Sequence, residues 1–205
     1  MSLLAVEGLE KRYRRGLLSR QVTFSLAADF RIADPAVVGV MGPNGSGKTT
    51  LFELITGSNR PSAGRVVCCG KDIHRVRADE RDRLAIHYHQ AYQVRRFARR
   101  LPNFLLERAD SAYPMVHLFD EPQFSTQDGY IGFMLDFFRR LRREGRLVFL
   151  CLHPNERYHL DILREVCERY LFVFQGRVSQ APDFAALLQD ERVRAYLGDL
   201  AHGLH

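Results

Sequence analysis

The sequence has few cysteines and no long stretch without charge. None of its four cysteines stands in a C-x-x-C pair, so we expect buried thiols rather than a disulfide framework or a metal site. The longest stretch free of Asp, Glu, Lys and Arg runs from Pro35 to Gly47, which is too short and too rich in glycine to span a bilayer. The first residues contain no basic region followed by an apolar core, so no signal peptide is expected. These absences favour a protein of the reducing cytoplasm.

Composition and charge are those of an ordinary globular chain with a basic surface. The 205 residues suit one domain, 1–205, and 46% apolar with 26% charged residues is typical of a soluble protein. The net charge is +6, and the excess is arginine clustered at residues 95–100 and 139–143. Such clusters permit contact with nucleic acid or an anionic membrane, but they do not choose between these partners.

The most specific pattern is a glycine-rich loop between an apolar run and a helical run. Residues 42–49 match the phosphate-loop pattern G-x-x-x-x-G-K-[ST] without a mismatch. Residues 36–41 before the loop have the pattern of a buried strand, and residues 49–57 after it favour a helix. Strand, glycine turn and helix form the context that this motif requires. The sequence therefore predicts a binding site for a nucleoside triphosphate.

The residue types of this loop explain how it would hold phosphates. Its three glycines allow successive backbone N–H groups to converge on an anion, and the first turn of the next helix adds unpaired N–H groups. Lys48 is expected to reach the β- and γ-phosphates, and the Thr49 hydroxyl is expected to bind Mg²⁺. The predicted nucleotide-binding residues of the loop are Gly42, Asn44, Gly45, Ser46, Gly47, Lys48, Thr49 and Thr50.

Strands and helices alternate along the rest of the chain. Apolar runs and alternation predict strands at 3–6, 36–41, 65–69, 84–89, 115–119, 147–152 and 171–174, and a strand pair within 21–32. Helical spacing predicts helices at 49–57, 79–83, 91–108, 131–141 and 160–170, and two short helices after residue 182. This alternation favours an α/β sheet with a parallel centre and a phosphate site at the carboxyl ends of its strands.

Several further segments follow in the order of one family. Residues 116–122 form an apolar strand that ends in Asp120, Glu121 and a proline, and His153 follows the next strand. Gln90 ends the strand before them, residues 125–128 stand one position longer than a D-loop, and Tyr13 precedes the phosphate loop. With these motifs, the chain resembles the ATP-binding cassette (ABC) ATPases from about residue 3 to residue 198.

The resemblance implies a fold, two ligands and a set of roles. It implies a P-loop NTPase core, with a mixed, mostly parallel central sheet flanked by helices and an N-terminal antiparallel β region, that binds ATP and Mg²⁺. By resemblance, Asp120 holds Mg²⁺ through water, Glu121 orients or deprotonates the attacking water, and Tyr13 stacks on adenine. Gln90 and His153 would sense the γ-phosphate. The implied catalytic residues are Glu121, His153 and Gln90, and the implied metal ligands are Thr49, Gln90 and Asp120.

One part of the family pattern is missing. Only residues 91–119 separate Gln90 from Asp120, so the helical subdomain is expected to be reduced to about 91–113. The family's L-S-G-G-Q sequence is replaced by Arg96-Phe97-Ala98-Arg99-Arg100. Four readings stay open. An arginine among Arg95, Arg96, Arg99 and Arg100 acts across an interface as an arginine finger; the chain pairs with a different ABC-type subunit; turnover is very slow; or these arginines form a solvated helix face.

The resulting prediction is an ABC-type ATPase subunit that binds and hydrolyses Mg-ATP to drive or gate a larger membrane transport assembly. Its expected partners are a membrane subunit or a second ABC-type subunit, in a homodimer or heterodimer, at the cytosolic face of a membrane. Two alternatives stay open. One is a soluble ABC-type ATPase that acts on nucleic acid, which the basic charge favours. The other is an ATP-binding structural or regulatory subunit with little turnover.

Overall fold

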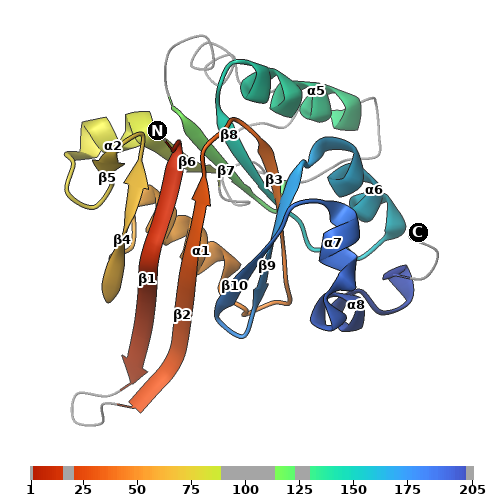
Figure 1. Cartoon of the computed structure of the whole chain (residues 1–205), viewed down its shortest axis with the longest axis horizontal. Helices are drawn as coiled ribbons and strands as arrows, with labels where there is room; N and C mark the ends of the chain where they lie inside the picture. Colours follow the sequence, from red (N-terminus) through yellow and green to blue (C-terminus); the bar gives the residue numbers. More distant parts are fainter. Residues whose placement is uncertain (1, 16–20, 89–113, 123–129, 202–205) are drawn as a thin grey trace.

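Ten strands of the described chain form one sheet. The computed structural model describes residues 2–15, 21–88, 114–122 and 130–201 (Figure 1). The strands follow the order β5-β4-β1-β2-β10-β9-β3-β8-β7-β6 across the sheet. They are β1 (Leu4–Arg15), β2 (Gln21–Ile32), β3 (Val37–Met41), β4 (Ala63–Cys68), β5 (Lys71–Asp72), β6 (Ala85–Tyr88), β7 (Val116–Asp120), β8 (Leu147–Cys151), β9 (Arg169–Phe174) and β10 (Arg177–Ala181).

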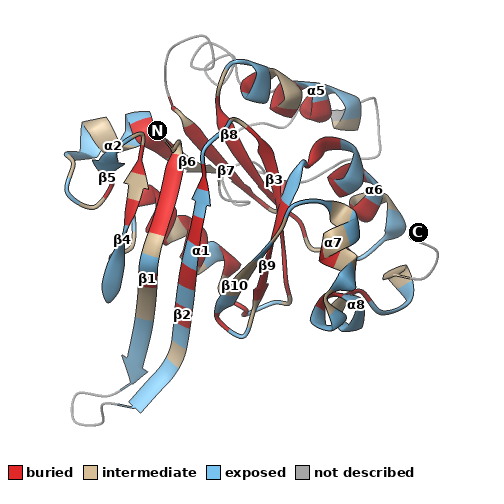
Figure 2. Ribbon diagram, in the orientation of Figure 1, coloured by how far each residue is buried: buried red, intermediate tan, exposed pale blue. Residues whose placement is uncertain are grey.

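The centre of this sheet is parallel and buried on both faces. Strands β9, β3, β8, β7 and β6 pair in parallel. Every residue of β3, β7 and β8 is buried, as Figure 2 shows. Continuous apolar strands are what a parallel sheet covered on both faces requires. The predicted α/β fold with a parallel centre and an N-terminal antiparallel region is confirmed.

Helices cover both faces of the parallel centre. They are α1 (Lys48–Thr56), α2 (Ala78–Leu84), α5 (Tyr130–Arg143), α6 (Arg157–Val166), α7 (Phe184–Gln189) and α8 (Glu191–Leu197), and a 3-10 turn, η1 (Gly198–Ala201), follows. Helix α1 packs in one core with the antiparallel strands β1, β2 and β4. Helices α5 to α8 pack in a second core on the other face of β3 and β8 (Figure 1). The sheet therefore encloses α1 between its two parts.

The antiparallel part differs from the sequence-based expectation. The predicted strand pair within residues 21–32 is wrong, because these residues form the single strand β2. No turn interrupts it, and every second residue from Leu26 to Ile32 is buried. Strand β1 continues to Arg15, well beyond the predicted 3–6, and pairs with β2 along its charged half. Side chains that alternate between a core and solvent explain why apolar runs alone give too short a strand.

Strands β5 and β10 were not identified from the sequence. Strand β10 has no fully buried residue, and it pairs antiparallel with β9 through a turn at Gln175 and Gly176. Both turn residues have positive φ, 47° and 71°, as a two-residue hairpin turn requires. The predicted helix 91–108 lies outside the described residues, as does the reduced helical region 91–113. No helix in the described part of the chain has the length and apolar character needed to cross a membrane.

Candidate functional site

The phosphate loop lies between the carboxyl end of β3 and the start of α1. Gly47 caps this nine-residue helix without a side-chain hydrogen bond, and the first turn contains no acidic residue. The Leu51 N–H reaches back to the Gly47 carbonyl over 2.8 Å, so the helical bonds begin there. The N–H groups of the first turn are therefore left to bind an anion, and the helix dipole favours negative charge at this point.

Gly42 shows why the loop needs glycine. Its φ is 150°, and a Cβ on this residue would overlap the backbone carbonyl of Val173 in β9. The loop can therefore start this close to the sheet only without a side chain. Such a close backbone approach places the following N–H groups around a confined space.

Lys48 lies inside the loop. Its side chain is buried, and its Nζ donates to the carbonyl oxygens of Gly42 at 2.7 Å and Pro43 at 3.0 Å. An ammonium group has three N–H bonds, so one donor beyond these two remains for a phosphate oxygen. The buried hydroxyl of Ser46 has no hydrogen-bond partner among the described residues. Both features suit a loop whose polar groups converge on an anion.

Asp120 is held beside the loop by the Thr49 hydroxyl, and His87 and Cys151 lie close to it. Its Oδ2 accepts a hydrogen bond from the Thr49 hydroxyl at 3.0 Å and lies 3.4 Å from Nε2 of His87. The Cys151 thiol on the neighbouring strand also donates to this carboxylate. Burial raises the pKa of Asp120, but these hydrogen bonds lower it by more, so the net pKa is below its ordinary value. The carboxylate therefore remains ionised at neutral pH.

Thr49 and Asp120 make a suitable oxygen pair for a hard cation. An ionised carboxylate and a hydroxyl are ligand types that Mg²⁺ prefers, and they lie at the N-terminal end of α1, where phosphates would bind. The residues present therefore fit Mg²⁺. The sequence predicted Thr49 and Asp120 as ligands from separate motifs, and the fold brings them into direct contact. His87 of β6 lies beside the same carboxylate, and the sequence analysis gave it no role.

Glu121 follows Asp120 with a strained backbone. Its φ is 50°, a left-handed conformation that costs a non-glycine residue about 1–3 kcal/mol. A hydrogen bond of 3.0 Å from its N–H to the Cys151 carbonyl holds this turn in place. Glu121 lines a cleft of about 270 Å³ together with loop residues. The lining residues are Phe24, Asn44, Gly45, Gly47, Lys48, Thr49, Thr50 and Glu121. The predicted base and the predicted phosphate ligands thus share one cleft.

His153 lies just after β8 and is half-buried. Its Nδ1 is 2.9 Å from the hydroxyl of Tyr196 on α8, and the two ring centroids are 5.9 Å apart. Burial raises the pKa of Tyr196, so the phenol is neutral at physiological pH. Sequence reasoning missed Tyr196, because no motif precedes it and more than forty residues separate it from His153.

Tyr13 lies near the cleft but does not line it. Its hydroxyl accepts a hydrogen bond from Nδ2 of Asn59 at 2.7 Å, and Lys11 Nζ lies 5.1 Å from its ring. Phe24, which does line the cleft, pairs with Tyr13 across β1 and β2 with ring centroids 6.1 Å apart. The stacking role of Tyr13 stays a prediction, and Phe24 is an aromatic residue at the site that the sequence analysis did not identify.

Other predicted residues lie outside the described part of the chain. These are Gln90, Arg95, Arg96, Arg99, Arg100 and residues 125–128. The role of Gln90 as a metal ligand and γ-phosphate sensor stays a prediction, and so does any role of the four arginines.

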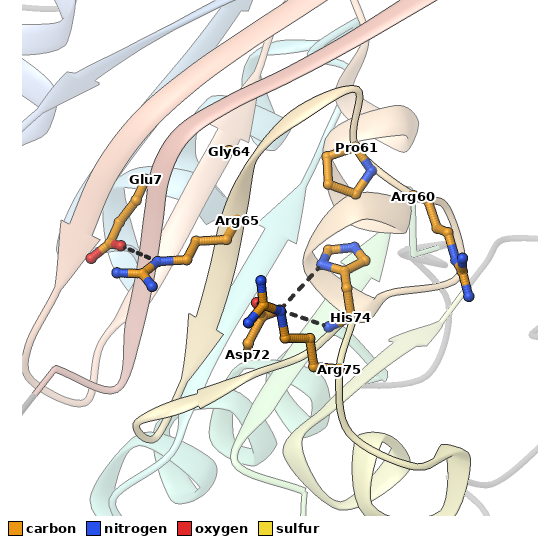
Figure 3. A pocket seen from close by; sticks show the side chains of 8 residues that line it. All are labelled: Glu7, Arg60, Pro61, Gly64, Arg65, Asp72, His74 and Arg75. Carbon is orange, nitrogen blue, oxygen red and sulfur yellow. Dashed lines mark hydrogen bonds and ion pairs between the residues drawn. The ribbon is translucent and has the colours of Figure 1, made fainter.

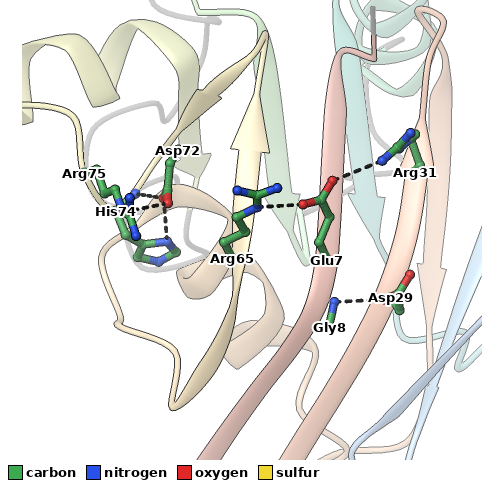
Figure 4. Close-up of polar contacts among 8 residues, drawn as sticks. All are labelled: Glu7, Gly8, Asp29, Arg31, Arg65, Asp72, His74 and Arg75. Carbon is green, nitrogen blue, oxygen red and sulfur yellow. Dashed lines mark hydrogen bonds and ion pairs between the residues drawn. The ribbon is translucent and has the colours of Figure 1, made fainter.

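A larger cleft, of about 560 Å³, lies away from the phosphate loop (Figure 3). Its charged side chains largely neutralise one another. Glu7 pairs with Arg65 at 2.6 Å and with Arg31 at 3.0 Å, and Asp72 pairs with Arg75 at 3.3 Å (Figure 4). The two Glu7 contacts tie β1, β2 and β4 together on the solvent side. We therefore assign this cleft no part in the nucleotide site.

Residues 27–127 match the family described as "ABC transporter". This stretch contains the phosphate loop, Asp120 and Glu121. The chain belongs to the ABC transporter family. The resemblance noted from the motifs is thereby confirmed: by its family, the chain is an ABC ATP-binding subunit.

Two relatives illustrate the extent of the similarity within the ABC family. The lipopolysaccharide export system ATP-binding protein LptB of Haemophilus influenzae is 27% identical over 248 positions, covering 97% of this chain and 98% of that protein. LptB of Acidithiobacillus ferridurans is 37% identical over 86 residues, which are 42% of this chain and only 33% of that protein. The full-length alignment needs more positions than this chain has residues, so the relative contains segments that this chain lacks.

Solved structures agree on the ABC fold. The ADP conformation of MJ1267, an ATP-binding cassette of an ABC transporter, superposes with a TM-score of 0.67. The identity is 16%, and the match covers 96% of this chain and 98% of that chain. At this identity the similarity concerns the arrangement of strands and helices, and it supports the predicted fold class independently of the motifs.

Proposed function

We propose that this chain binds Mg-ATP and hydrolyses it to drive or gate a membrane transport assembly. The observation that carries the proposal is the 3.0 Å contact of Thr49 with Asp120 at the start of α1, beside a cleft that contains Lys48 and Glu121. A cation ligand pair, a phosphate cradle and a carboxylate for the attacking water are the parts that phosphoryl transfer needs.

The chain's residues divide the work by position. The first-turn N–H groups of α1 and the third N–H of Lys48 bind the phosphate oxygens and offset their charge. Thr49 and Asp120 hold Mg²⁺, which when bound supplies Lewis-acid polarisation of the phosphoryl oxygens. Glu121 orients the attacking water and accepts its proton, since it lines the same cleft. His153 follows β8 and is not among the residues that line the cleft, and its proposed role is to donate to the γ-phosphate.

The proposed assembly includes a membrane subunit. Support comes from the family and from relatives whose names describe export systems, such as LptB. The chain itself would then sit at the cytosolic face of a membrane. The helical subdomain is reduced in this proposal, to about 91–113, and the full-length alignment with LptB agrees with this chain being shorter than that relative. A smaller subdomain gives a docking surface that differs from that of ABC subunits with the full subdomain. In this proposal the membrane partner therefore has a different shape at this contact.

Turnover is tested by Glu121→Gln in the complex purified from native membranes. We expect ATP binding to persist and hydrolysis to fall at least 100-fold, because the carboxylate that accepts the proton is lost. Glu165→Gln is the matched control, since this glutamate is on α6 and pairs with Arg139 at an exposed site. Unchanged turnover in Glu121→Gln would exclude catalysis by this chain and favour the alternative of an ATP-binding regulatory subunit.

The assembly is tested by co-purification at low salt. We expect an integral membrane protein, and recovery of nucleic acid without a membrane protein would contradict the proposal. The structure weakens the nucleic-acid alternative, because the arginines at the end of α5 form ion pairs. Arg139 pairs with Glu165, Arg140 with Glu144 and Arg142 with Glu168, at 2.6–2.8 Å. Paired guanidinium groups contribute less to phosphate binding than unpaired ones.

A further inference from the structure

Helix α8 places a tyrosine against the phosphate loop and His153. Val193 and Leu197 are buried in the second core, so the short helix is anchored by its apolar side. Tyr196 lies between these two residues in the sequence, and its ring packs 5.8 Å from that of Phe172 on β9. The buried residues of α8 and the ring of Phe172 therefore hold the Tyr196 hydroxyl 2.9 Å from Nδ1 of His153.

The same hydroxyl has a second partner. The backbone N–H of Gly42, the first glycine of the phosphate loop, donates to the Tyr196 oxygen. This bond opposes the rise in the pKa of Tyr196 that burial causes, and the net pKa remains above its ordinary value. The phenol thus keeps its proton at neutral pH, and its oxygen already accepts one hydrogen bond.

These two contacts decide which way the proton points. A phenol has one O–H donor, and a buried donor without an acceptor is costly. Since the Gly42 N–H is a donor, it cannot accept the phenol proton, whereas Nδ1 of a neutral imidazole can. The Tyr196 O–H therefore donates to Nδ1 of His153. In a neutral ring, the other nitrogen, Nε2, must then carry the hydrogen.

We propose that Tyr196 is a positioning residue that fixes His153 as the Nε2–H tautomer and links it to Gly42 of the phosphate loop. The inference rests on the proposed role of His153 at the γ-phosphate. An Nε2–H group can donate to a phosphate oxygen, whereas the opposite tautomer would direct a lone pair at that anion. Helix α8 thereby belongs to the nucleotide site, although it is remote from every motif in the sequence.

The tautomer is measured directly on ¹⁵N-histidine-labelled full-length chain by two-bond ¹H–¹⁵N spectra at pH 8, where an ordinary imidazole is neutral. His153→Gln assigns the signal among the eight histidines. We expect a hydrogen on Nε2 in the wild type and a mixture of tautomers in Tyr196→Phe, which removes one oxygen only. Tyr170→Phe is the matched control, because this buried phenol donates to the Leu163 carbonyl on α6 at 2.8 Å.

Kinetics gives the second measurement. We expect Tyr196→Phe to lower kcat roughly fivefold, the effect of one neutral hydrogen bond, with KM for ATP changed less than about twofold. Tyr170→Phe should leave kcat unchanged at equal folded fraction. A wild-type signal with hydrogen on Nδ1, or a Tyr196→Phe signal identical to the wild type, would overturn the proposal. The spectra need no turnover, so a chain without ATPase activity would refute the proposed function and leave this test intact.

Discussion

Gly42→Ala should destabilise the protein far more than Gly45→Ala, although both glycines belong to the phosphate loop and both have positive φ. At Gly45 φ is 74°, and a Cβ would meet nothing within 4 Å. At Gly42 φ is 150°, and a Cβ would overlap the Val173 carbonyl. Strands β3 and β9 pair directly at this point, with Met41 opposite Phe172. The overlap can be relieved only by separating two central strands.

The magnitudes follow from these two environments. A left-handed conformation costs alanine about 1–2 kcal/mol, and this is the whole expected effect at Gly45. At 2–4 °C per kcal/mol for a chain of this size, Gly45→Ala lowers Tm by about 2–8 °C. Gly42→Ala adds the disruption of β3 against β9, for a total of about 4 kcal/mol and a fall of about 8–16 °C.

The assay is thermal unfolding followed by far-UV circular dichroism, since the chain has no tryptophan for fluorescence. Urea unfolding gives the free energies, and an unchanged m-value would confirm that the native and unfolded states remain comparable. Equal losses in the two variants would refute the reasoning, because they would mean that β9 does not constrain the loop. A larger loss in Gly45→Ala would refute it more directly.

Three further predictions concern buried and cleft residues. Burial and the charge of Arg146 lower the pKa of His117 to about 3. Between pH 6.5 and about 3 only the unfolded chain therefore takes up this proton. The free energy of unfolding should fall by up to about 1.4 kcal/mol for each pH unit of acidification in this range. Urea titrations should show that slope reduced in His117→Gln. Thr49→Val should weaken Mg-ATP binding roughly tenfold and leave metal-free ATP binding nearly unchanged in calorimetry, because only the cation loses a ligand. Phe24→Ala should raise the Kd for ATP severalfold, because the ring lines the cleft. An unchanged Kd would mean that the adenine ring of ATP does not contact Phe24.

The parts of the candidate site that the sequence located are contiguous in the chain. The loop and α1 follow from one motif because their geometry is local: a strand ends, glycines turn and a helix begins. Asp120 and Glu121 were identified by resemblance to the ABC ATPases, at the end of an apolar strand, and their roles stay predictions. The contact of Asp120 with Thr49 follows from the parallel sheet, because the carboxyl ends of β3, β7 and β8 share one edge.

The parts that sequence reasoning missed depend on contacts between distant segments. His87 lies beside Asp120 because β6 pairs with β7, and no motif in the sequence marks this histidine. Tyr196 reaches His153 because α8 is anchored by Val193 and Leu197. Phe24 lines the cleft because β2 passes beside the loop, where the Phe24 ring lies 2.9 Å from the position of a Cβ on Gly47. In each case the side chain is ordinary for its position, and only the fold gives it a functional neighbour.

The loop is in fact held by strands and a helix from three separate parts of the chain. The side chains of Phe24 and Leu26 on β2 lie 2.9 Å from the position that a Cβ on Gly47 would take. The Val173 carbonyl of β9 approaches Gly42 from the sheet, and the phenol on α8 binds the Gly42 N–H. Since none of these contacts is local, the loop has this shape only in the folded chain. The N–H groups that bind phosphate are therefore oriented before ATP arrives, which reduces the ordering entropy that binding must overcome.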